Sequence, residues 1–324
     1  MFVTTHDSHD QAWNLAMEEV LLTLDDGEWF LLWQNAPCVV IGRHQLAARE
    51  VDRAACQEMG VTVIRRKTGG GAVYHDLGNF NFTFVGKAGA SVDFAHYNGR
   101  VAEFLQSLGL TAAPTGRNDI AVDGAKVSGN AQWRQGGRVL HHGTLLYDAE
   151  LAAAARVLTP HQAKYQGRGV ASVRSRIANI AALMANPLPR AAFAEALLDW
   201  MAAAPGASRV ALPHHLCQQA DAIAPTYREP AWVWGQEAAY TRENTLRMAA
   251  GTVTARLEIQ DGTMTKVRLH GDFFFDPAPI CQVLTSVAHE QEAIKKALHT
   301  LSDEQWAGVD VDEWVGLFSS EVEE

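Results

Sequence analysis

An Asp-Gly pair at residues 123–124, between two short runs of alternating residues, constrains this chain more than any other feature. Asp-Gly is typical of a two-residue type I′ turn, so it predicts an antiparallel hairpin over 119–128 and fixes its register. Directly paired residues share a face and successive residues alternate. The face predicted to be apolar consists of Ile120, Val122, Ala125 and Val127. The other carries Asp119, Ala121, Lys126 and Ser128. The apolar face anchors the hairpin, so the polar face is free to bind a ligand.

Helical and strand patterns alternate along the rest of the chain. Apolar residues at helical spacing predict helices over about 13–24, 46–59, 101–108, 190–203 and 279–299. Residues 61–64 predict a strand, and alternating phenylalanines over 80–84 predict a half-buried one. Further hairpins are predicted at 135–138 and at Asp261-Gly262. Because several strands are joined by hairpins, we expect an α/β (α+β) fold with a mixed sheet flanked by helices.

Three prolines, Pro213, Pro225 and Pro230, interrupt the chain after the last helix of this pattern. They predict a domain boundary near residue 228. The first domain then covers 1–228, and a smaller α+β domain covers 229–324.

Charge and composition exclude several classes of protein. The formal net charge is −10, so the chain lacks the overall basic character of a nucleic-acid-binding protein. Its apolar runs are too short to cross a bilayer, and residues 1–10 are too polar for a signal peptide. The four cysteines form no CxxC pair, so neither a zinc site nor a disulfide framework is indicated. We therefore expect a cytoplasmic protein without a nucleic-acid or membrane partner.

Three consecutive glycines, Gly69 to Gly71, follow the pair Arg65-Arg66. Ordering three glycines costs more backbone entropy than ordering other residues, so the run needs a reason. One reason is a close approach of the backbone to a ligand, with amide groups turned toward phosphate oxygens. The two arginines would then donate hydrogen bonds to the same anion. The run is neither a P-loop nor a dinucleotide-binding fingerprint, because both need other spacings. Alone, it is also compatible with a flexible turn beside exposed charges. Lys126 is likewise compatible with a surface lysine, and His75 and His142 with structural histidines.

Five segments in fixed order narrow these alternatives. They are 65–79 (Arg-Arg-Lys-Thr-Gly-Gly-Gly-Ala-Val-Tyr-His-Asp-Leu-Gly-Asn), 117–120 (Arg-Asn-Asp-Ile), 126–131 (Lys-Val-Ser-Gly-Asn-Ala), 141–146 (His-His-Gly-Thr-Leu-Leu) and 172–176 (Ser-Val-Arg-Ser-Arg). With these motifs the chain resembles the lipoate–protein ligases over residues 1 to about 180. The resemblance is weaker after 230, where 232–236 and 271–274 are similar to the accessory domain of those enzymes.

The resemblance implies a two-step reaction with ATP, magnesium and lipoate. The lipoate carboxylate would attack the α-phosphate of ATP, giving lipoyl-AMP and pyrophosphate. A lysine of an apo lipoyl domain, in a 2-oxoacid dehydrogenase E2 subunit or the glycine-cleavage H protein, would then accept the lipoyl group. Residues 1–228 would form the catalytic domain that binds lipoate and ATP, and 229–324 the accessory domain.

The resemblance also implies roles for individual residues. Lys126 would be the catalytic residue and contact both lipoate and the adenylate. Arg66 would contact the nucleotide or the activated acyl group. The backbone and side chains expected to line the ATP site belong to Gly71, Ala72, Val73 and Tyr74. Asp119 would help to hold magnesium. Arg174 and Arg176 would either bind phosphate or be surface charges.

An octanoyl or lipoyl transferase that acts without ATP is the alternative, because such enzymes share this catalytic fold. It would need a nucleophilic cysteine. Cys38 and Cys56 precede the glycine run, whereas Cys217 and Cys281 follow the last motif. The missing cysteine and the extra C-terminal domain favour the ligase. A binding protein without activity would not need Lys126 or the glycines, which this chain has.

Overall fold

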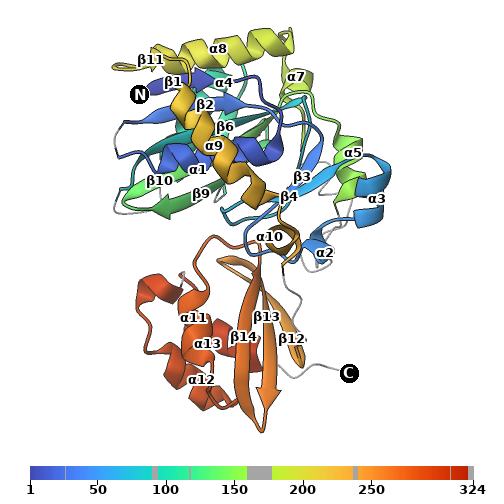
Figure 1. Ribbon diagram of the computed structural model, residues 1–324, viewed down its shortest axis with the longest axis vertical. Coiled ribbons are helices and arrows are strands. Elements are labelled where there is room, and N and C mark those ends of the chain that lie inside the picture. The colour runs from blue at the N-terminus through green and yellow to red at the C-terminus, as the bar shows by residue number, and fades with distance from the viewer. Residues whose placement is uncertain are drawn as a thin grey trace.

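Two units stacked along the long axis make up the protein, as the computed structural model in Figure 1 shows. The structure describes residues 1–25, 27–89, 94–116, 118–158, 177–235, 240–306 and 308–319. The larger unit contains an eight-stranded and a three-stranded sheet, and the smaller unit a further three-stranded sheet. The predicted fold class, a mixed sheet flanked by helices with a smaller α+β domain, is confirmed. No helix in the described ranges is long and apolar enough to cross a membrane.

The eight-stranded sheet has the order β11-β1-β2-β6-β10-β9-β8-β7. Its strands are β1 (Phe2–Thr5), β2 (Trp29–Trp33), β6 (Asn79–Lys87), β7 (Ala112–Thr115), β8 (Asp119–Val122), β9 (Ala125–Gln135), β10 (Arg138–Leu146) and β11 (Ser208–Arg209). β1 runs parallel to β2 and β11, and the other neighbours are antiparallel. The predicted hairpin at 135–138 joins β9 to β10.

Helices cover both faces of this sheet. On one face lie α1 (Gln11–Leu22) and α9 (His214–Tyr227), and on the other α4 (Phe94–Ser107) and α8 (Arg190–Ala202). The alternating residues of β2 serve both layers, because Trp29, Leu31 and Trp33 pack toward α1 and α9 while Phe30 and Leu32 pack toward α4 and α8. Two short helices complete this unit, α5 (Leu151–Val157) and α7 (Ile180–Leu183).

Strand β6 departs from the predicted half-buried strand, because its residues 79–86 are buried on both faces. Phe80, Phe82 and Phe84 join the core under α4 and α8, as their spacing predicts. The polar side chains of Asn81 and Thr83 face the other side, where Thr83 accepts a hydrogen bond from Trp33 Nε1 at 2.9 Å. These polar residues are therefore part of the interior of the molecule and not of its surface.

The Asp123-Gly124 hairpin is present, with the positive φ values of 49° and 80° that a type I′ turn needs. Val122 pairs with Ala125 and Ala121 pairs with Lys126, as a two-residue turn requires, but a bulge shifts the register between Ile120 and Ala121. The register predicted from a two-residue turn would pair Asp119 with Ser128, and this is wrong, since Asp119 pairs with Gly129. A bulge puts two residues of one strand opposite one of the other. It leaves Ile120, Val122 and Val127 in the core as expected.

The glycine run connects two strands of the smaller sheet of this unit. Here β3 (Cys38–Ile41) lies between β4 (Thr62–Arg65), to which it is parallel, and β5 (Val73–His75), to which it is antiparallel. The single helix predicted over 46–59 is wrong, because α2 (Ala47–Glu50) and α3 (Arg53–Glu58) are separate. The carboxylate of Asp52 accepts from the Ala55 amide at 2.9 Å and so begins a new helix as its N-cap.

The smaller unit packs three helices against one sheet. Its strands are β12 (Arg242–Met248), β13 (Gly251–Gln260) and β14 (Thr263–Gly271), and its helices are α11 (Ala278–Leu284), α12 (Gln291–Leu298), α13 (Val311–Ser319) and the 3-10 helix Asp303–Trp306. The hairpin at Asp261-Gly262 is present. The continuous helix predicted over 279–299 is wrong. The Ser286 amide donates to Met264 O at 2.7 Å, and Ala288 forms a bridge with Thr263. This pairing with β14 interrupts the helix.

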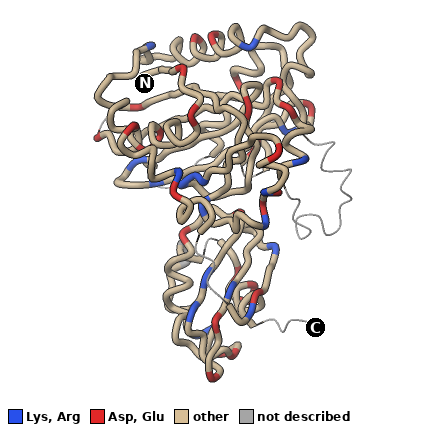
Figure 2. Tube along the Cα trace, turned by 45° about the vertical axis from the view of Figure 1, so that its right-hand side comes forward, with Lys and Arg blue, Asp and Glu red and all other residues tan. Residues whose placement is uncertain are grey.

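Helix α10 (Pro230–Trp234) lies at the junction of the two units (Figure 1). The Trp232 indole donates to Arg65 O at 2.9 Å, which attaches α10 to the end of β4 in the larger unit. The boundary at 228/229 stays a prediction. Acidic and basic residues are interspersed over both units (Figure 2).

Candidate active site

A cavity of about 430 Å³ lies where the two sheets of the larger unit, the glycine run and the smaller unit meet. Its apolar wall consists of Leu15, Trp33, Val40, Val73 and Phe274. Polar residues of β6 and β10 face the same space, among them Asn81, His142 and Thr144. The cavity therefore combines an apolar surface for a hydrocarbon chain with polar groups, as ligand sites commonly do.

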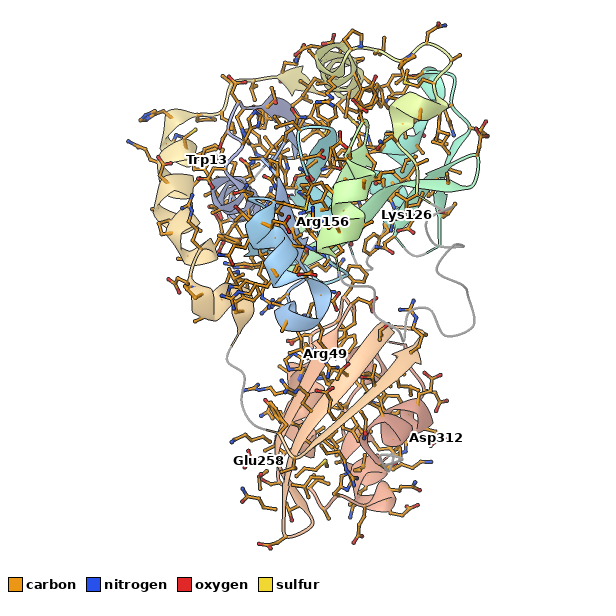
Figure 3. The ribbon with its side chains drawn as sticks, turned by 90° about the vertical axis from the view of Figure 1, so that its right-hand side faces the viewer. Trp13, Arg49, Lys126, Arg156, Glu258 and Asp312 are labelled. Carbon is orange, nitrogen blue, oxygen red and sulfur yellow. The ribbon has the colours of Figure 1, made fainter. Side chains whose placement is uncertain are left out.

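Lys126 lines this cavity beside Asp119, as the hairpin predicts (Figure 3 labels the lysine). Its Nζ lies 2.7 Å from Asp119 Oδ1, and both side chains are partly exposed. The ammonium lies over Gly129, because a Cβ on that glycine would be 3.2 Å from Nζ and 3.3 Å from Cε. Behind it, the Ala178 amide donates to Lys126 O at 3.1 Å. The main chain of Lys126 is thus fixed while its ammonium faces the cavity.

Arg66 supports the glycine run from inside the protein. Its guanidinium donates to Val40 O at 3.0 Å, Gly69 O at 2.7 Å, Gly71 O at 2.8 Å and Thr68 Oγ1 at 2.9 Å. Burial lowers the pKa of Arg66 to about 10, which leaves it charged at neutral pH. Four of its five N–H groups are therefore engaged by the protein, and one remains for a ligand.

Arg65 does not contribute to the cavity, which contradicts the idea that both arginines donate to one anion. Its guanidinium donates to five backbone carbonyls, those of Gly42, Arg43, Gln45, Trp232 and Val233. Two of these belong to α10, so Arg65 holds that helix against the larger unit. Its role is structural.

A buried hydrogen-bond network joins the histidine pair to α1 and the glycine run. His142 Nδ1 lies 2.9 Å from Glu18 Oε1, and His142 Nε2 lies 2.9 Å from Thr68 Oγ1. Thr68 in turn accepts from Arg66, so the network runs from a carboxylate in α1 to the arginine under the glycines. The sequence gives no local signal for Glu18, which appears only as a polar residue in an amphipathic helix.

His75 lines the cavity in its neutral form. Burial, together with the nearby Arg66 and His142, lowers its pKa to about 3. Its Nδ1 accepts from Asn35 Nδ2 at 3.0 Å, so the proton of the neutral ring is on Nε2. His75 Nε2 and Asn81 Nδ2 have no hydrogen-bond partner within the described part of the chain. Buried donors of this kind are usually satisfied by water or a ligand.

Three of the four predicted ATP-site residues line the cavity. Gly71, Ala72 and Val73 line the cavity, whereas Tyr74 packs on the other side with Val39 and Ile41. A contact of Tyr74 with ATP stays a prediction and would use its backbone. Arg117, Arg174 and Arg176 lie outside the described residues.

Residues of the smaller unit also reach the cavity, which the motifs did not indicate. Arg247, Asp272 and Phe274 line it, and the Gly70 amide donates to Phe273 O at 3.1 Å. A Cβ on Gly69 would lie 2.1 Å from Phe273 O, so this position accepts only glycine. The smaller unit thus packs directly against the glycine run. Nothing local in the sequence places residue 247 beside residue 70.

The described carboxylates near the cavity do not by themselves form a magnesium site. The described residues contain no group of three His, Cys, Asp or Glu side chains that could hold a metal ion. Asp119 is the counter-ion of Lys126, so by itself it does not form a metal site. A magnesium ion that arrives on nucleotide phosphates needs only one or two carboxylates. Asp119 as that ligand stays a prediction.

Family models match both units of the chain. Residues 10–202 match the lipoyl protein ligase A/B catalytic domain, and residues 237–318 match the bacterial lipoate protein ligase C-terminus. Lipoate-protein ligase LplJ of Bacillus subtilis is 31% identical over 95% of this chain and 96% of its own length. The chain belongs to the lipoate–protein ligase family. Lipoate–protein ligase 1 of Staphylococcus aureus is 32% identical over 92% of this chain and 93% of its own length.

Solved structures of family members have the same fold. Plasmodium falciparum LipL1 in complex with lipoate superposes with a TM-score of 0.81 at 22% identity, over 99% of both chains. A lipoate-protein ligase A bound with ATP superposes with a TM-score of 0.61 at 26% identity, over 72% of this chain and 96% of its own. The first comparison covers both units of this chain.

Proposed function

We propose that this family member is an ATP-dependent lipoate–protein ligase. The observation that carries the proposal is that Lys126, the glycine run and a wall of apolar side chains line one cavity together. An acyl chain fits the apolar wall, and a nucleotide phosphate fits the glycine amides. The names of the relatives support this function, and so does the neighbour with bound ATP.

The chemical difficulty of the first step is that two anions must meet. A lipoate carboxylate oxygen bonds to the α-phosphorus of ATP, the bond to the bridging oxygen breaks, and pyrophosphate leaves. The Lys126 ammonium between carboxylate and phosphate offsets their repulsion and stabilises the charge that develops in the transition state. Magnesium, when bound with ATP, neutralises charge on the leaving pyrophosphate.

The second step transfers the acyl group. A lysine amine of the acceptor attacks the carbonyl carbon of lipoyl-AMP, the bond from that carbon to the phosphate oxygen breaks, AMP leaves, and the amine loses a proton. Lys126 stabilises the negative charge that develops on the phosphate of AMP as AMP leaves. Arg66 holds Gly69 and Gly71 in place beneath the nucleotide. The proposed acceptors are apo lipoyl domains of E2 subunits and the H protein, in the cytoplasm. A structural neighbour from Thermoplasma acidophilum is described as a ligase with its E2 lipoyl domain.

The proposal predicts that mixing lipoate, ATP and magnesium releases pyrophosphate without any acceptor. The covalent transferase needs a cysteine in the site, yet no cysteine lines the cavity formed by the described residues. Cys38, Cys56 and Cys281 are buried elsewhere. Replacing all four cysteines by serine or alanine should therefore leave adenylate formation intact in the folded protein. Mass spectrometry of an apo lipoyl domain would measure the second step. Acylation from octanoyl-carrier protein without ATP would overturn the proposal.

Gly129 gives a prediction about how Lys126 is positioned. An alanine methyl would press on the lysine Nζ and Cε at about 3.2–3.3 Å, and the flexible lysine end would yield. We expect Gly129→Ala to fold normally and to slow adenylate formation by roughly tenfold, since small displacements of a preorganised charge are costly. Gly124→Ala, which meets no atom within 4 Å but has a positive φ, is the control, and should change stability without changing the rate. Equal rates for wild type and Gly129→Ala would show that the ammonium tolerates the shift.

A further inference from the structure

Arg247 is a cation of the smaller unit that lines the cavity of the larger one. It lies near the end of β12, and its side chain is 60% exposed. Its Nη1 donates to Thr252 Oγ1 at 2.9 Å and lies 3.5 Å from Asp272 Oδ2. Both contacts use one nitrogen, so Nε and Nη2 face no acceptor in the described ranges. The guanidinium is therefore held in direction by Thr252 while most of its donors stay open.

The charges that line the cavity show why such a group matters. Among the described residues they are Arg66, Lys126, Arg247, Asp119 and Asp272. Asp119 pairs with Lys126, and the donors of Arg66 are mostly bound to backbone carbonyls. Without Arg247, the two remaining cations are balanced by the two carboxylates. A nucleotide triphosphate carries several negative charges, so without Arg247 the described charged side chains of the cavity would offer it no net positive charge.

The smaller unit holds Arg247 at this place through contacts with His44 and the glycine run. The Gly271 amide donates to His44 O at 2.9 Å, and His44 stacks on Phe273 with ring centroids 4.8 Å apart. Phe274 lies close to Gly70, where a Cβ would be 2.9 Å from its ring. Basic residues occur at this junction between the units (Figure 2). The contacts keep the arginine at the cavity that the glycine run also lines.

We propose that Arg247 binds the polyphosphate of ATP during adenylate formation, so that the accessory domain contributes a residue to the nucleotide site. This inference rests on the proposed ligase function. A guanidinium donates two parallel hydrogen bonds to phosphate oxygens, which matches the open Nε and Nη2. Because pyrophosphate leaves after the first step, Arg247 acts in adenylation and not in acyl transfer. Asp272 beside it opposes the same phosphates.

The test measures the two half-reactions separately in the full chain. Arg247→Ala should raise the KM for ATP about tenfold in pyrophosphate release, the effect of losing one charge-assisted hydrogen bond. The KM for lipoate should not change, and neither should acyl transfer from supplied lipoyl-AMP to an apo lipoyl domain. Arg247→Lys should fall between wild type and alanine. Asp272→Asn, which can still accept from the Thr252 amide, should lower the KM for ATP.

Arg268→Ala is the matched control, because Arg268 is exposed on β14 in the same sheet and does not line the cavity. It should leave the KM for ATP unchanged. An unchanged KM for ATP in folded Arg247→Ala overturns the inference, and so does a raised KM for the acceptor in the transfer assay. The lipoate KM reports folding of the site in each variant. If the wild-type protein releases no pyrophosphate, the proposed ligase function is wrong. If the wild-type protein releases pyrophosphate and Arg247→Ala has a normal KM for ATP, only the role of Arg247 is wrong.

Discussion

Replacing Lys126 by alanine is expected to slow both half-reactions by about 10²–10³, the usual cost of losing one preorganised group that stabilises a transition state. In the proposed mechanism, both reactions pass through charge on atoms that this ammonium would contact, namely the carboxylate and the α-phosphate. The fold should be unaffected. The lysine side chain is 39% exposed and Asp119 33%, and an ion pair this accessible contributes little stability, about 0–1 kcal/mol.

The measurement compares pyrophosphate release from lipoate and ATP with acyl transfer from supplied lipoyl-AMP, beside the thermal unfolding of each variant. Lys126→Arg should not restore full activity, because a planar guanidinium cannot replace a compact ammonium that lies over Gly129. Asp123→Ala, in the turn of the same hairpin, controls for damage to the hairpin. A folded Lys126→Ala protein with near-normal rates in both assays would make Lys126 an ordinary surface lysine.

The hairpin that carries Lys126 shows which structural features the local sequence predicts and which it does not. Asp-Gly correctly predicts the turn, the buried apolar residues and the closeness of Asp119 to Lys126. The bulge between Ile120 and Ala121 was missed, because the pairs that follow it extend past the ten residues of the predicted hairpin. Gly129 pairs with Asp119, and Asn130 exchanges hydrogen bonds with Asn118 beyond it. The sequence of residues 119–128 alone does not predict these pairs, because they involve residues outside it.

Strand β6 shows a second limit. Alternating Asn, Phe and Thr residues predict a strand with one wet face, yet the polar face is enclosed by α1 and the cavity. Alternating polar and apolar residues indicate that the two faces of a strand differ. They do not indicate whether the polar face contacts water or lines a binding site. The same holds for Arg247 and Asp272, whose place at the cavity depends on the docking of the second unit.

The two adjacent arginines are alike in sequence and opposite in position. Arg65 points to α10 and Arg66 to the glycine run, because successive side chains of an extended backbone alternate. No local rule tells which of the two faces the cavity.

Replacing Arg66 by alanine is therefore expected to abolish activity and to destabilise the protein, in contrast to Lys126→Ala. The change leaves the carbonyls of Val40, Gly69 and Gly71 without their donor inside the protein. Each unsatisfied buried acceptor costs about 1–3 kcal/mol, so the free energy of unfolding should fall by about 3 kcal/mol or more. Adenylate formation should drop below about 1% of wild type, since the glycine amides lose their fixed arrangement.

Urea unfolding and pyrophosphate release per folded molecule are the two readouts. Arg66→Lys should restore little stability or activity, because a compact ammonium cannot donate to all the carbonyls that the wider guanidinium reaches. Arg65→Ala is the matched control. It also loses buried carbonyl partners, so it should be destabilised, but it lies outside the cavity and should keep most of its adenylation rate when folded. If Arg66→Ala and Arg65→Ala lose stability and rate in equal proportion, Arg66 is only a structural residue, and its assignment to the nucleotide site is wrong.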